Sequence, residues 1–146
     1  MSLDKNKKLQ FFTPDFESEI RIQFSQEMVS AGFPSPANDF LENKIDLNKE
    51  LSKNPLATFY IRVKGNSMID SGINDKDVLV VDRSLEPKNN KIAICFLDGE
   101  FTVKRIKLEK GILHLMPENK NYSPIKITED NHFMIWGIVT YIIKAV

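Results

Sequence analysis

One serine sits in a setting that could support nucleophilic chemistry. Ser67 follows Gly65 and Asn66 at the end of a strand-like stretch, in the run VKGNSMID. A glycine at this point lets the backbone turn sharply, which leaves the serine hydroxyl exposed. Backbone N–H groups beside Ser67 would then face an incoming carbonyl, as an oxyanion hole requires. The alternative interpretation of the same residues is an ordinary Gly-Asn turn without chemistry.

A nucleophilic serine needs a base, and neither histidine is well placed to supply one. His114 lies within the run LHLM, and His132 opens the last strand-like segment. No Ser-His-Asp order is apparent in the chain. A lysine can replace histidine when it is buried, because desolvation disfavours its charged form.

Lys104 is the candidate base, because it alternates with apolar residues in the strand-like run EFTVKRIKL. A period of two places four residues on one face of this strand: Thr102, Lys104, Ile106 and Leu108. Arg105 and Lys107 fall on the opposite face, where we expect solvent. The alternative for Lys104 itself is also solvent exposure, the usual state of a lysine in a strand.

Composition indicates one soluble domain and excludes several function classes. The chain has 146 residues, with 20 Lys plus Arg against 20 Asp plus Glu, so its bulk charge attracts neither nucleic acid nor membrane. The single cysteine, Cys95, lies in the apolar run IAICFL and is expected to be a core thiol. We expect no metal and no cofactor, since neither histidine has metal-ligand spacing.

The N-terminal residues indicate neither secretion nor a membrane. The run MSLDKNKKLQFFTPDF is too polar for a signal peptide. No apolar run approaches the ~18 residues that a membrane-spanning helix needs. We therefore expect a cytoplasmic protein.

Short apolar or alternating runs dominate the chain from Thr58 onward and predict a mostly β domain. About seven strands are expected, separated by turn residues. Their runs are TFYIRVKG, DVLVVD, IAICFL, GEFTVKRIKL, GILHLM, SPIKIT and FMIWGIVTYIIKAV. The pattern is typical of a compact β barrel or sandwich.

The first 57 residues are less regular. Residues 1–31 contain only a weak strand pattern around Ile22 and are interpreted as an extended arm that docks on another surface. Residues 32–57 are expected to be a mostly helical or loop lead-in. There Ile45 continues a helical spacing, and Asp46 is a candidate cap for a short helical turn through Leu51, with Asn54-Pro55 as the stop signal.

Three blocks of the sequence, in this order, resemble the UmuD family of SOS mutagenesis proteins, which are related to the LexA-type self-cleaving repressors. The blocks are AGFPSPANDFLENKIDLN, GNSMIDSGINDKDVLVVD and DGEFTVKRIKL. The similarity covers roughly residues 30–145. It implies a compact LexA/UmuD-type C-terminal β domain, residues 32–146, with short helical segments and an N-terminal arm that self-cleavage removes.

The resemblance also implies a role for individual residues. The serine of GNSM, Ser67, matches the family nucleophile, and the lysine of EFTVK, Lys104, matches its general base. The family cuts its own chain before FPSP, which here is the Ala31–Gly32 bond. The family often has Cys-Gly at this point and the related repressors have Ala-Gly. Small residues suit a bond that must enter a narrow cleft.

A mechanism and a set of partners follow from this resemblance. Neutral Lys104 would take the Ser67 proton, and backbone amides of Ser67 and Met68 would hold the oxyanion. The resemblance implies a homodimer, activation by a RecA–single-stranded DNA filament, and a UmuC-type error-prone polymerase as partner. Neither direct sequence-specific DNA binding nor membrane association is expected.

Two alternatives from other classes remain at this point. A LexA-like repressor would need an N-terminal helix-turn-helix domain, and the residues before the expected cut are too few for a three-helix unit. A non-catalytic β-rich binding module would make Ser67 and Lys104 structural. Self-cleavage distinguishes the binding module from the peptidase.

Overall fold

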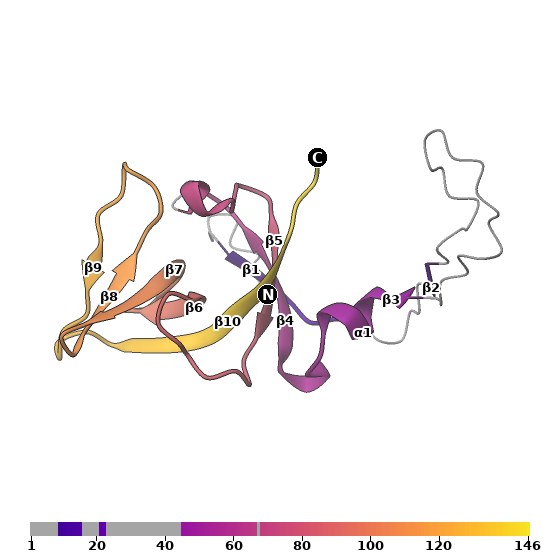
Figure 1. Cartoon of the computed structure of the whole chain (residues 1–146), viewed down its shortest axis with the longest axis horizontal. Helices are drawn as coiled ribbons and strands as arrows, with labels where there is room; N and C mark the ends of the chain where they lie inside the picture. Colours follow the sequence, from indigo (N-terminus) through magenta and orange to yellow (C-terminus); the bar gives the residue numbers. More distant parts are fainter. Residues whose placement is uncertain (1–8, 16–20, 23–44, 67) are drawn as a thin grey trace.

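A computed structural model of the chain describes residues 9–15, 21–22, 45–66 and 68–146 (Figure 1). The described part is mainly β. Its strands are β1 Leu9–Phe12, β2 Arg21–Ile22, β3 Ile45–Asp46, β4 Thr58–Val63, β5 Val78–Asp82, β6 Ile92–Leu97, β7 Glu100–Glu109, β8 Ile112–Met116, β9 Ile125–Lys126 and β10 Phe133–Ile143. Its helical segments are α1 Leu47–Leu51, η2 Pro55–Ala57 and η3 Ile69–Ser71.

Eight of these strands form one curled antiparallel sheet in the order β1-β4-β5-β10-β6-β7-β8-β9. The long strand β10 lies at the centre, where it pairs with β5 on one side and with β6 on the other. Figure 1 shows β10 running from the β6–β9 part of the sheet to the β4–β5 part. All seven strands predicted from the sequence are present, so the prediction of a mainly β fold is confirmed.

The strands from β6 to β8 form hairpins because their connections contain residues that accept positive φ. Asp98 and Gly99 join β6 to β7 with φ angles of 48° and 92°. Lys110 and Gly111 join β7 to β8 with φ angles of 50° and 75°. Two consecutive positive φ angles are typical of the tight turns that match the twist of antiparallel strands. These turns fix the register of β7, the strand that carries Lys104.

The two faces of the sheet bury two separate apolar clusters. The first core contains Leu9, Ile61, Val63, Met68, Ile73, Leu79, Val81, Ile94 and Val103. The second core contains Ala93, Cys95, Ile106, Leu115 and Ile138. Strand β7 contributes to both, through Val103 and Ile106. A strand in the interior of a curled sheet can therefore bury residues on both of its faces.

Strand β10 bends around the sheet at two irregularities of register, one between Ile135 and Gly137 and one between Val139 and Tyr141. Such bulges increase local twist and curve a sheet. A Cβ atom at Gly137 would lie 2.6 Å from the Val81 Cγ1 atom, so only glycine fits the first irregularity without displacement. The side chain of Val81 is fully buried there.

The lead-in to the sheet differs in part from the sequence prediction. Asp46 caps α1 as expected, and its Oδ1 accepts the Asn48 N–H at 3.0 Å. Ile45, however, lies in strand β3 and not in a helix. The helix runs to Leu51 as predicted, and Pro55 begins the separate turn η2. A proline is well tolerated at the first position of a helical turn.

Strand β1 lies within the first 31 residues and is part of the main sheet. It pairs with β4 in antiparallel register, from Leu9 opposite Val63 to Phe12 opposite Tyr60. Leu9 is buried in the first core, and Phe11 packs against it. The short strand β2 pairs with β3 in a second, two-stranded sheet. The weak strand pattern around Ile22 thus corresponds to a real strand.

Candidate functional site

Lys104 lies in the interior of β7 and is 6% exposed. Its backbone partner across the sheet is Ala93 of β6, and Ile106, two residues further on the same face, lies in the second core. The predicted burial of Lys104 among apolar side chains is therefore confirmed. Burial disfavours the charged form of a lysine, which is the property that a lysine base needs.

An aromatic ring from the loop between β8 and β9 lies near the Lys104 ammonium group. The Lys104 Nζ atom lies 5.8 Å from the centroid of the Tyr122 ring. A cation within about 6 Å of a ring centroid is attracted to the ring face. The Tyr122 ring thus lies near the end of the Lys104 side chain.

Cys95 lies close enough to Lys104 for the charge of Lys104 to affect the pKa of its thiol. Burial raises the pKa of the Cys95 thiol to about 12, and the positive charge of Lys104 opposes this shift. The thiol is fully buried and forms no disulfide. The prediction of a core thiol is confirmed, and Cys95 stays protonated at neutral pH.

Three of the predicted site residues, Ser67, Ala31 and Gly32, lie outside the described residues. The residues on either side of Ser67 are described, and they define the turn that carries it. Gly65 has a φ of 107°, a conformation that favours glycine, and its N–H donates to Asp75 Oδ1 at 2.9 Å. The sharp turn that the sequence predicted after β4 is present.

The residue after Ser67 is held in place from two directions. The Met68 side chain is 2% exposed and belongs to the first core. The Met68 carbonyl accepts the N–H of Ser71 at 3.0 Å and that of Ile73 at 3.3 Å. The backbone immediately after Ser67 is therefore fixed by core packing and by the short turn η3.

The loop between β8 and β9 joins the turn around Ser67 to Lys104. Asn119 Nδ2 donates to the Asn66 carbonyl at 2.6 Å, directly before Ser67. The Glu118 carbonyl accepts the Asp70 N–H at 2.7 Å. Tyr122 of the same loop lies beside Lys104. One loop thus contacts the backbone on both sides of Ser67 and the side chain of Lys104.

A small cavity of about 30 Å³ lies between the start of this turn and β7. It is lined in part by Leu9, Gly65, Met68, Thr102 and Val103. A cavity of this size holds about one water molecule. Because Leu9 belongs to β1, the N-terminal strand reaches the edge of the site.

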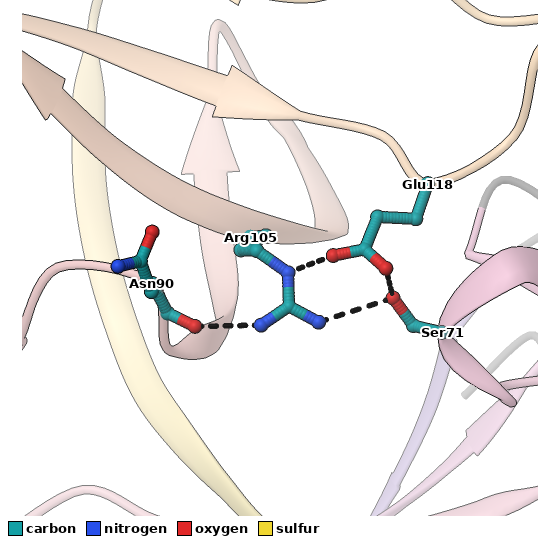
Figure 2. A network of polar contacts seen from close by, with 4 residues as sticks. All are labelled: Ser71, Asn90, Arg105 and Glu118. Carbon is teal, nitrogen blue, oxygen red and sulfur yellow. Dashed lines mark hydrogen bonds and ion pairs between the residues drawn. The ribbon is translucent and has the colours of Figure 1, made fainter.

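Arg105 departs from the prediction that it would face solvent. Its side chain is 31% exposed and pairs with Glu118 through Nε and Oε1. Figure 2 shows the remaining contacts, in which Arg105 Nη2 donates to Ser71 Oγ at 3.2 Å and Nη1 donates to the Asn90 carbonyl at 2.6 Å. The prediction was wrong because the sheet curls and the β8–β9 loop covers this face of β7. Lys107 is 42% exposed and pairs with Glu109 on its own strand at 3.0 Å.

The two histidines lie on other elements. His114 is in β8, opposite Lys107 of β7, and the His132 N–H donates to Asp98 Oδ1 at 2.9 Å. Within the described ranges, no group of three or more His, Cys, Asp or Glu side chains could hold a metal ion.

Three residues near the site, Glu118, Asn119 and Tyr122, were not predicted from the sequence. All three lie in the run PENKNYSP. Its polar and aromatic residues between two prolines could have suggested a structured loop, because such loops often carry function. Their partners, however, are far away in the sequence.

Comparisons with known proteins agree on one family. The sequence model of the Peptidase S24-like family matches residues 23–140. Protein MucA of Salmonella typhimurium is 43% identical over 121 residues, which is 82% of each chain. Protein SamA of the same species is 42% identical over 114 residues, 78% of this chain and 79% of its own. Protein ImpA of Escherichia coli is 38% identical over 128 residues, 87% of this chain and 86% of its own.

The match to this family model and the similarities to MucA, SamA and ImpA define the class of protein as a serine peptidase. The chain belongs to the Peptidase S24-like family. MucA, SamA and ImpA are proteins of the UmuD family, so the resemblance found from the three sequence blocks is confirmed. No helix in the described part of the chain is long and apolar enough to cross a membrane.

Proposed function

We propose that the protein is a self-cleaving peptidase that cuts its own Ala31–Gly32 bond with a Ser67–Lys104 dyad. The cut acts in the SOS response to DNA damage, and the truncated product serves as an accessory subunit of an error-prone translesion polymerase. Membership of the Peptidase S24-like family supports the peptidase activity. Similarity to MucA and ImpA over more than four fifths of the chain supports the SOS role.

The observation that carries the proposal is the burial of Lys104 next to the loop that holds the Ser67 turn. A lysine with only a structural role would be more stable with its ammonium group in contact with solvent, because removing that group from water costs free energy. Lys104 is 6% exposed and lies near Tyr122, while Asn119 of the same loop bonds the carbonyl before Ser67. The desolvation suits a lysine that must be neutral to accept a proton.

The proposed reaction has two stages. Neutral Lys104 takes the proton of the Ser67 hydroxyl while Oγ attacks the Ala31 carbonyl carbon. The tetrahedral intermediate collapses, the Ala31–Gly32 C–N bond breaks, and protonated Lys104 gives its proton to the Gly32 amine. Water then hydrolyses the ester, which releases the Ala31 carboxylate and regenerates Ser67.

The oxyanion of the intermediate would be held by backbone N–H groups of Ser67 and Met68. Such donors work best when they are fixed before the reaction, because no reorganisation is then needed. The buried Met68 side chain and the two hydrogen bonds to its carbonyl supply that rigidity. Lys104 and Met68 thus have separate roles as base and oxyanion donor.

The proposed partners follow from the same family. They are a second copy of the chain in a homodimer, a RecA–single-stranded DNA filament as activator and a UmuC-type polymerase subunit. The balanced net charge of the chain supports contacts with proteins more than direct binding to DNA.

Incubation of the purified chain at alkaline pH tests the peptidase activity directly. Higher pH removes the proton from Lys104, so self-cleavage should accelerate and give a fragment that begins at Gly32. Intact mass measurement and N-terminal sequencing identify the fragment. Ser67→Ala and Lys104→Ala should each abolish it.

Lys107→Ala is the matched control, since this lysine lies on the same strand but is 42% exposed at its side chain. It should cleave at the wild-type rate. A fragment from Ser67→Ala equal to that of wild type would exclude the dyad. Absence of any fragment, with the RecA filament present as well, would favour a non-catalytic binding module.

A further inference from the structure

A closed ring of polar contacts lies beside the proposed dyad but outside it. Both Glu118 carboxylate oxygens are occupied, Oε1 by Arg105 Nε and Oε2 by the Ser71 hydroxyl. Arg105 Nη2 donates to Ser71 Oγ at 3.2 Å and closes the ring (Figure 2). Every donor in the ring faces an acceptor.

The ring joins elements that are distant in the sequence and that carry the two proposed catalytic groups. Arg105 follows Lys104 directly on β7. Ser71 ends η3, the turn that follows Ser67 and Met68. Glu118 comes from the β8–β9 loop, and its carbonyl also accepts the Asp70 N–H at 2.7 Å.

Arg105 extends the connection to a fourth segment. Its Nη1 donates to the Asn90 carbonyl at 2.6 Å, in the loop before β6. Asn90 has a φ of 68°, and its N–H donates to the Ile106 carbonyl at 2.8 Å. The planar guanidinium group thus binds three partners in one plane, which a lysine ammonium group cannot do.

We propose that Arg105 and Glu118 are positioning residues that set the location of the Ser67 turn relative to Lys104. This inference rests on the proposed self-cleavage. The two proposed catalytic residues come from different elements, and their separation depends on how η3 is attached to β7. The Arg105–Glu118–Ser71 ring is a direct side-chain attachment between these elements.

The geometry favours a role in the reaction over a general role in stability. An exposed ion pair contributes little to folding, as expected for Lys107 and Glu109. The Arg105–Glu118 pair is more buried, with exposed side-chain fractions of 31% and 27%, and shares a neutral hydroxyl with η3. Its loss would remove the side-chain attachment of η3 to β7, while the core packing of Met68 and the bond from the Asp70 N–H to the Glu118 carbonyl would remain.

Glu118→Gln tests the proposal, with Glu109→Gln as the matched control on the exposed pair. Self-cleavage is followed at alkaline pH, well below the melting temperature of each variant. We expect Glu118→Gln to cleave about 10- to 100-fold more slowly than wild type, because small displacements of reacting groups have effects of that size. Glu109→Gln should cleave at the wild-type rate.

A second readout separates positioning from folding. The rate at which a small serine-directed phosphonylating reagent modifies Ser67 should fall in Glu118→Gln, because this reaction also needs the base near the hydroxyl. A purely structural role would lower the melting temperature and leave this rate unchanged. Arg105→Lys should be as slow as Glu118→Gln, since it keeps the charge but loses the planar contacts.

Ser71→Ala provides a milder variant if Glu118→Gln does not fold. It removes only the hydroxyl from the ring and should also slow cleavage. Folded Glu118→Gln and Ser71→Ala that both cleave and react as wild type would overturn the positioning role while leaving self-cleavage intact. A wild-type chain that never produces the Gly32 fragment would instead remove the proposed function, and the positioning role with it.

Discussion

At the residue scale, β6 and β7 place two buried titratable side chains on one face of the sheet. Cys95 and Lys104 lie on neighbouring strands, and both are buried. Burial favours the neutral form of each, which for the thiol is the unreactive form and for the amine is the basic form. Burial thus keeps the Cys95 thiol unreactive and favours the neutral form of the Lys104 amine.

Cys95 should resist modification as long as the chain is folded. Its pKa is raised from 9.0 to about 12, so almost no thiolate exists near neutral pH. An aromatic disulfide reagent at about pH 8 should react slowly with the native chain and at once with the chain in concentrated urea. Rapid and complete reaction of the native chain would contradict this assignment.

The raised pKa of Cys95 also affects stability at high pH. Above pH 9.0 the unfolded thiol loses its proton, whereas the folded thiol keeps it up to about pH 12. The unfolded state therefore binds fewer protons in this range, and the free energy of unfolding falls as the pH rises. Cys95→Ser should reduce this part of the pH dependence in urea unfolding curves measured between those two values.

At the element scale, β10 organises the sheet, and its bend depends on Gly137. We expect Gly137→Ala to lower the free energy of unfolding by about 1–3 kcal/mol, the usual effect of overpacking a core. The added Cβ would meet the fully buried Val81 side chain at 2.6 Å. Thermal unfolding followed by circular dichroism measures the change.

Gly111→Ala offers a contrast, because a Cβ at Gly111 would meet no atom within 4 Å. Its φ of 75° would still introduce backbone strain. A Gly137→Ala, Val81→Ala double variant should lose less stability than the sum of the losses of the two single variants. A loss equal to that sum would show that the clash with Val81 is not the cause.

The strands that were predicted correctly share one property, namely that their signal is local. Alternation or a short apolar run between turn residues is enough to define each of the seven strands from β4 to β10. Strand β1 has no such signal, because its four residues form a strand only by pairing with β4. Strand β2 has only the weak alternation around Ile22, and β3 has none; the two strands pair with each other.

The features of the candidate site also divide into those with a local sequence signal and those that depend on distant residues. The period of two in β7 places Lys104 on a face with apolar residues, but by itself it leaves solvent exposure as an alternative. The contacts of Arg105 with Glu118 and Ser71 depend on how the sheet curls, which brings together residues 13 and 34 positions apart. The Ser67–Lys104 roles themselves remain predictions that the family resemblance supports.

At the scale of the whole molecule, the described N-terminal residues are part of the folded structure. Four residues of β1 pair with β4, and Leu9 is 6% exposed. The Phe11 ring lies 4.8 Å from the Phe101 ring and 4.9 Å from the Trp136 ring, measured between centroids. Backbone pairing and aromatic packing thus hold β1 on the sheet in addition to the covalent link to β4.

The proposed cut at Ala31–Gly32 should therefore leave β1 bound at first. After cleavage, the N-terminal fragment should co-elute with the β domain in size-exclusion chromatography and separate under mild denaturant. Phe11→Ala removes the aromatic contacts and should release the fragment more readily. Immediate separation of the wild-type fragment in native buffer would contradict this expectation.

Hydrolysis of a peptide bond and departure of a strand differ in their reversibility. The first is permanent on the time scale of the cell, whereas the second is an equilibrium that a competing strand can shift. A cut molecule that retains β1 would be irreversibly cleaved while β1 still covers the edge of β4. The edge of β4 would then be the site at which a competing strand from a partner displaces β1.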